Sequence, residues 1–165
     1  MRALVWIVED TWKATIASAA AFLPADADIT LLHVTASEAE AVARGARHGL
    51  LGRSHPSPAE PLHAISEQSV NYLLDEAQML LGRTAVREAR RGRVEREVVA
   101  AADGMDLLVL ARDGDRAHRG PRSLGPAARF VVDHAPCAVL LVWPDAAPST
   151  TTTPSPRPGA RSPSS

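Results

Sequence analysis

The chain lacks most features that mark specialised classes of protein. A single cysteine, Cys137, excludes an intrachain disulfide, which fits a reducing compartment. No apolar run approaches the ~20 residues that span a bilayer, so we expect no membrane segment. The apolar run from Ala3 to Val8 is interrupted by Glu9 and Asp10 and is too short for a secretory signal. We interpret it as a strand and expect a cytoplasmic protein.

An excess of charge of one sign is also missing. The formal net charge is -1, so we expect neither nucleic acid nor an anionic membrane as a partner. The chain has no Walker-type G-x-x-x-x-G-K-[ST] loop. It has no nucleophile elbow either, because glycine is absent two residues before Ser123. We therefore predict no catalytic set and no enzyme, with slow ATP hydrolysis as the alternative left open.

The apolar pattern predicts five strands alternating with four helices. Four of the strands are continuous apolar runs, typical of a sheet buried on both faces: residues 4–8, 29–34, 106–111 and 138–143. Residues 85–90 alternate instead, which favours an edge strand. This order predicts an α/β fold with a doubly wound parallel sheet and helices on both faces. An amphipathic helix is predicted from one stripe that precedes a stop at Gly82: Val70, Leu73, Leu74, Ala77, Leu80 and Leu81. A last helix should open at Gly125 and Pro126 and carry Ala127, Phe130 and Val131 on one face.

The domain is expected to end at residue 143. Residues 144–165 are almost entirely Pro, Ser, Thr, Ala and Gly, which predicts a disordered tail, either inert or a phosphorylation target. Residues 35–63 are irregular in pattern. The wide spacing of His48, His55 and His63, without cysteine partners, argues against a metal site.

The C-terminal half carries a family resemblance. An apolar strand, DLLVLA, leads into a glycine-containing loop and a short helix, followed by APCAVLLV over residues 135–142. This stretch resembles the universal stress proteins, and the likeness covers roughly residues 3 to 143. The resemblance implies an adenine-nucleotide α-hydrolase-like fold with strand order 3-2-1-4-5, a homodimer, and in one subgroup ATP binding.

The family's ATP-binding pattern is only partly present. The pattern is G-x-x-G, nine residues, then G followed by Ser or Thr. Here Ala111 stands at the first glycine, Gly114 matches the second, and ten residues separate it from Gly125. Pro126 replaces the hydroxyl residue. The resemblance therefore implies the fold more strongly than it implies ATP.

The predicted strand order places a candidate nucleotide site where strands one and four lie side by side. The loops after Val8 and Ala111 should meet there, and the arginines after Ala111 suit phosphate oxygens. Asp113 and Asp115 would oppose a polyphosphate unless Mg²⁺ lay between them. The alternative is a solvated connecting loop, with Val34 in the core and Asp10 as a helix cap. The candidate residues are Glu9, Asp10, Val34, Arg112, Gly114, Arg122, Ser123 and Gly125.

The last strand, from Ala138 to Trp143, is wholly apolar although it should lie at an edge, which predicts a homodimer through it. A helix or the tail covering that edge is the alternative. Three functions follow: a regulatory domain with a degenerate pocket for ATP or AMP with Mg²⁺, a genuine nucleotide switch, or an interaction module without a ligand.

Overall fold

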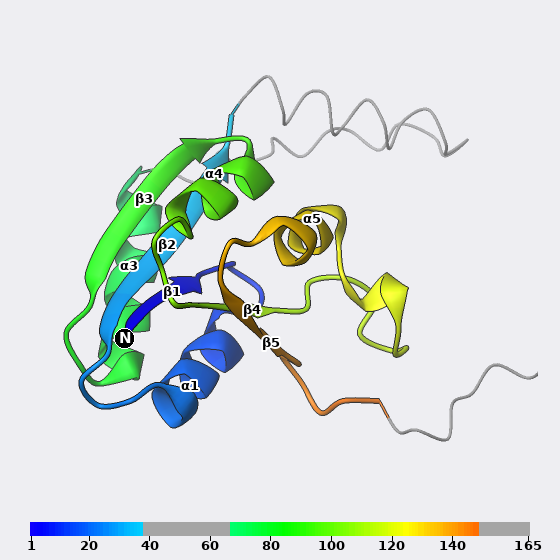
Figure 1. The fold of residues 1–165 in the computed structure, drawn as a ribbon, viewed down its shortest axis with the longest axis horizontal. Coiled ribbons are helices and arrows are strands. Elements are labelled where there is room, and N and C mark those ends of the chain that lie inside the picture. The colour runs from blue at the N-terminus through cyan, green and yellow to red at the C-terminus, as the bar shows by residue number, and fades with distance from the viewer. Residues whose placement is uncertain (38–66, 149–165) are drawn as a thin grey trace, which may run out of the picture.

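A computed structural model describes residues 1–37 and 67–148 of the chain. Its strands form one sheet in which all neighbours are parallel, in the order β3-β2-β1-β4-β5 (Figure 1). The strands are β1 (Arg2–Trp6), β2 (Asp28–Ala36), β3 (Val86–Gly92), β4 (Leu107–Ala111) and β5 (Ala138–Val142). This confirms the predicted order, with β3 and β5 at the two edges.

The strand ends differ from those predicted by the apolar runs. The first strand begins at Arg2, which pairs with Asp28, and it ends at Trp6 rather than Val8. The third strand extends to Gly92, which pairs with Ala36. The last strand stops before Trp143. Pairing with a neighbouring strand sets these ends, whereas hydropathy reports only where the side chains are buried.

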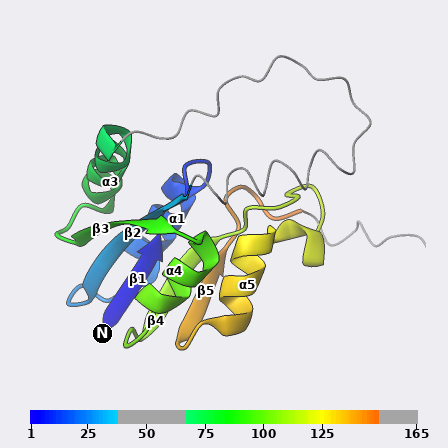
Figure 2. The same ribbon diagram turned by 90° about the horizontal axis from the view of Figure 1, so that it is seen from above.

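Helices cover both faces of the sheet, as predicted (Figure 2). On one face α1 (Trp12–Phe22) packs beside α3 (Glu67–Leu81), and on the other α4 (Val94–Ala101) packs beside α5 (Pro126–His134). A short 3₁₀ turn, η1 (Pro121–Ser123), precedes α5. The molecule is therefore a three-layer sandwich whose strand ends form one rim.

The predicted helix stripe is largely correct in α3, and in α5 only Val131 of the predicted stripe is buried. In α3, Leu80 is the exception, with 51% of its surface exposed, because the other stripe residues face the sheet and it lies at their margin. The helix ends at Leu81, and the next residue, Gly82, has a φ of +73° that suits glycine. In α5 the buried residues are Ala128 and Val131, not Phe130, whose ring stacks on His134 at 3.9 Å between centroids.

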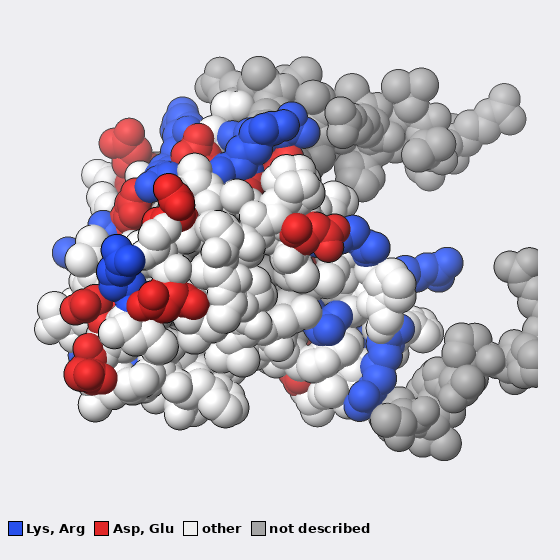
Figure 3. Space-filling model, in the orientation of Figure 1, with Lys and Arg blue, Asp and Glu red and all other residues white. Residues whose placement is uncertain are grey.

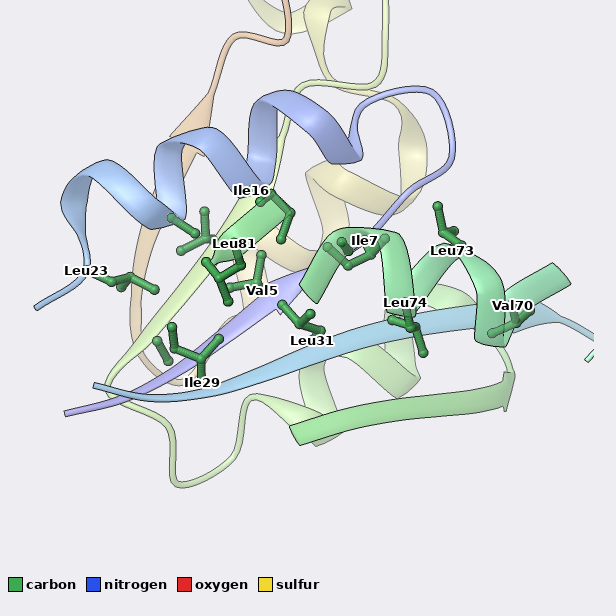
Figure 4. Close-up of a cluster of buried hydrophobic side chains, with 14 residues drawn as sticks. Val5, Ile7, Ile16, Leu23, Ile29, Leu31, Val70, Leu73, Leu74 and Leu81 are labelled. Carbon is green, nitrogen blue, oxygen red and sulfur yellow. The ribbon is translucent and has the colours of Figure 1, made fainter. Parts of the chain in front are cut away.

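The core is divided by the sheet into two apolar layers. Figure 4 shows the layer under α1 and α3, where Ile16 and Leu74 meet Val5 and Leu31. The opposite layer joins α4 and α5 to the other side of the same strands. His33 is buried, and its Nδ1 lies 3.0 Å from the carbonyl oxygen of Ile7. Since that carbonyl accepts, Nδ1 carries the proton, and the bond ties β2 to the end of β1.

Several predictions fall on residues outside the described ranges. His48, His55 and His63, most of the irregular segment 35–63, and the tail beyond residue 148 are among them. Within residues 1–37 and 67–148, no helix is long and apolar enough to cross a membrane. In the same ranges, no three His, Cys, Asp or Glu side chains lie close enough together to hold a metal ion.

Candidate functional site

The loops that follow β1 and β4 lie at the same rim of the sheet. β1 and β4 are neighbours, with Ala3 opposite Leu107 and Val5 opposite Val109, so both chains leave the sheet side by side. After β1, the carbonyl of Val8 accepts hydrogen bonds from the N–H groups of Thr11 and Trp12, each 2.9 Å long. This turn leaves Glu9 and Asp10 exposed to solvent.

A cavity of about 410 Å³ opens beside the first of these loops. Residues 9–14 line one side of it, and Pro144 and Asp145, which follow β5, line the other. Glu9 and Asp10 thus face the segment after β5. Val34 does not line this cavity. It is 7% exposed and belongs to the apolar layer under α4 and α5, together with Trp6 and Val98.

The loop after β4, residues 112–124, folds back on itself. The N–H of Gly114 donates to the carbonyl of Ser123 at 3.0 Å, and the N–H of Asp115 donates to that of Arg122 at 2.8 Å. A Cβ atom at position 114 would lie 2.3 Å from the oxygen of Arg122. Glycine is therefore required here because two backbone segments touch.

Arg112 is held on two sides by this part of the chain. Its Nη1 donates to the hydroxyl of Ser123, which in turn donates to the carbonyl of Gly120 at 2.7 Å. The guanidinium carbon lies 4.7 Å from the centre of the Trp143 ring, a cation–π arrangement. Its Nε is buried and has no hydrogen-bond partner within the described ranges. One donor of Arg112 is thus used by Ser123, and the hydroxyl donor of Ser123 is used by Gly120.

The start of α5 is occupied by a carboxylate of the chain itself. The N–H of Gly125 donates to Oδ1 of Asp113 at 2.7 Å. The next residue, Pro126, is the first of the helix and has no N–H. The positive end of a helix favours an anion, and here Asp113 supplies it.

The outer part of the loop is strongly charged. In Figure 3, Lys and Arg side chains stand around the loop and the start of α5. The outer loop also carries Asp115, whose hydrogen bond with Nδ1 of His118, 3.0 Å long, is the main cause that lowers its pKa. The N–H of Ala117 and the charge of Arg122 add to that effect. The carboxylate is therefore held ionised among the arginines.

A family comparison agrees with this architecture. The Universal stress protein family matches residues 8–142, which is most of the chain. The chain belongs to the universal stress protein family. No curated protein matches it closely enough to add a named relative.

Several solved structures share the fold at low sequence identity. The hypothetical protein MJ0577 is 17% identical with a TM-score of 0.61, over 86% of this chain and 94% of that one. Universal stress protein UspA from Lactobacillus plantarum is 19% identical with a TM-score of 0.56, over 86% and 97%. A universal stress protein in complex with cAMP is 14% identical with a TM-score of 0.59, over 86% and 96%. At these identities the likeness is one of fold.

The structure brings five of the eight candidate residues into one loop and leaves three apart from it. Arg112, Gly114, Arg122, Ser123 and Gly125 share the loop of this universal stress domain or its end. Glu9 and Asp10 line the cavity, and Val34 is in the core. Sequence reasoning missed two contacts. Asp113 accepts a hydrogen bond from Gly125, and Trp143 makes a cation–π contact with Arg112. No local motif marks either residue, because both contacts join segments far apart in the chain or across a loop.

Proposed function

We propose that this universal stress domain is a cytoplasmic regulatory or binding module with a degenerate adenine-nucleotide pocket, without catalytic activity. The observation that carries the proposal is the 2.7 Å bond from the N–H of Gly125 to the carboxylate of Asp113. A phosphate group at the start of α5 would need that N–H and would meet the negative charge of Asp113.

Two further features support weak binding. Pro126 offers no N–H to a phosphate, and the hydroxyl of Ser123 is bonded to Arg112 and Gly120. A hydrogen bond to a charged group contributes about 1.5–3 kcal/mol, so losing two of them weakens a micromolar site to about 0.1 mM or worse. We therefore expect ATP and AMP to bind weakly or not at all, with or without Mg²⁺.

Calorimetry on the full chain tests this proposal. ATP, AMP and cAMP are titrated with Mg²⁺ present, cAMP being included because one protein of the same fold was solved with it. The expected dissociation constants are about 0.1 mM or weaker for the reason given above. A low-micromolar constant overturns the degenerate pocket and favours a genuine nucleotide switch. Gly114→Asp is the control, since a side chain there collides with Arg122 and should remove any heat that arises in the loop.

A second candidate is an interaction module that works through its dimer surface. The observation favouring it is that β5 is an edge strand made of Ala, Val and Leu only. No strand of residues 1–37 and 67–148 pairs with its outer backbone groups, and a second copy of the chain would pair there. Size-exclusion chromatography with light scattering should give a dimer at micromolar concentration, and a monomer would contradict this assembly.

A further inference from the structure

We propose that residues 143–148, here called the strap, are a displaceable cover over loop 112–124, and that ligands carrying a phosphate chain bind when the strap leaves. The proposal rests on the proposed function, because it gives a second reason for weak binding by the intact chain. In Figure 2 the strap, drawn in orange after β5, runs beside the yellow-green loop.

Three arginines of the loop hold the strap. The guanidinium of Arg112 lies against the ring of Trp143 at 4.7 Å. Arg116 pairs with the carboxylate of Asp145 at 3.3 Å, and Nε of Arg119 donates to the carbonyl of Pro148. The groups best suited to phosphate oxygens are thus engaged by the chain's own ring, carboxylate and carbonyl.

The strap also reaches the other loop of the rim. Pro144 and Asp145 face residues 9–14 across the cavity of about 410 Å³. The strap therefore lies between the turn after β1 and the arginines after β4. A ligand that enters at this rim, where parallel sheets bind theirs, has to move it.

The contacts that hold the strap are weak enough to be exchanged. The side chains of Arg116 and Asp145 are 36% and 68% exposed, and exposed ion pairs contribute little to stability. Arg112 gains from an exchange, since its buried Nε has no partner within the described ranges. An anion that reached this Nε would supply that partner.

The chemistry of the freed groups indicates the ligand. Guanidinium groups bind phosphate oxygens in pairs of parallel hydrogen bonds, and three of them along one loop suit a chain of phosphates. While the strap is in place, the carboxylate of Asp145 occupies the position of one phosphate group beside Arg116. Inorganic triphosphate and ATP both carry this chemistry, and they differ in the adenosine part.

Two variants of the full chain test the strap. Asp145→Asn removes the ion pair and leaves every apolar side chain in place. The double variant Trp143→Ala, Asp145→Asn also removes the ring. Asp133→Asn, an exposed position on α5, is the control for the change in net charge, and Trp143→Phe is the control for the ring. Each chain is titrated with triphosphate and with ATP by calorimetry.

The expected result is tighter binding only when the strap is loosened. Asp145→Asn should bind about twofold to fivefold more tightly than the unaltered chain, and the double variant about threefold to thirtyfold. Tighter binding of triphosphate would show that the phosphate chain is recognised. Tighter binding of ATP alone would show that the adenosine part is needed as well. Both results support the strap.

Other results overturn the proposal. No gain in either variant, or an equal gain in Asp133→Asn, rejects the strap and leaves the degenerate pocket standing. Low-micromolar binding of ATP or triphosphate by the unaltered chain rejects both the strap and the degenerate pocket.

Discussion

Cys137 shows how its surroundings decide the chemistry of a single side chain. It lies just before β5, half-buried against the apolar layer under α4 and α5. Burial raises the pKa of the thiol, and the negative charge of Asp106 raises it further. The thiolate is the reactive form, so this cysteine is poorly suited to nucleophilic or redox work at neutral pH.

The thiol should therefore react slowly while the protein is folded. We expect iodoacetamide to modify Cys137 more slowly at pH 8 than in the chain unfolded by urea, with the inflection of the pH–rate profile at higher pH. Asp106→Asn removes the negative charge that helps to raise the pKa of Cys137, so the inflection should move part of the way toward its pH in the unfolded chain. Asp103→Asn, exposed and close in sequence, should leave it unchanged. A folded chain that reacts as fast as the unfolded one contradicts the raised pKa.

At the scale of the element, α5 depends on a charge that lies outside it. The N-cap residue is Gly125, which has no side chain to cap the helix. The carboxylate of Asp113 fills that role by accepting the N–H of Gly125. Asp133 sits in the last turn of the same helix, where a negative charge opposes the helix dipole.

Removing these two charges should change stability in opposite directions. Asp113→Ala should lower the free energy of unfolding by about 0.5–2 kcal/mol, since it removes a cap. Asp133→Ala should raise it by about 0.3–1 kcal/mol, because it removes an unfavourable charge and adds a better helix former. Urea denaturation of both variants measures the difference. Equal effects would show that the dipole and the cap play no part.

At the scale of the whole molecule, the position of β5 at the edge of the sheet determines the proposed assembly. The carbonyl of Val142 accepts the N–H of Arg112, so it points toward β4. Backbone groups alternate in direction along a strand, so those of Val139 and Leu141 point away from the sheet. These are the groups that a second copy of the chain would pair with.

Proline at position 139 should break the dimer and spare the fold. Val139→Pro removes an outward N–H, which a sheet tolerates at its edge, and should raise the dimer dissociation constant by at least about tenfold. Val139→Ala loses a similar part of the side chain but keeps the N–H, so it should remain dimeric. Light scattering measures both, with circular dichroism to verify folding. A dimeric Val139→Pro would place the interface elsewhere.

The sequence patterns alone determined the strands, the helices and their arrangement in layers, whereas the order of the strands came from the family resemblance. Continuous apolar runs such as residues 29–34 and the stripe of Val70, Leu73 and Leu74 predict buried strands and a covering helix, because burial repeats with the period of the element. Gly114 was identified as a match to the second glycine of the family's pattern. Local patterns suffice for these features since each depends on residues close together in the chain.

Only the tertiary structure decided which residues at the rim of the sheet contact one another. Asp113 contacts Gly125, Arg116 contacts Asp145, and Arg112 lies against Trp143, a residue whose apolar character had placed it in the last strand. The first contact closes one loop, and the other two join the segments after β4 and β5, which meet because these strands are neighbours in a parallel sheet. Charge and hydropathy along the chain carry no record of such distances, so folding alone brings these partners together.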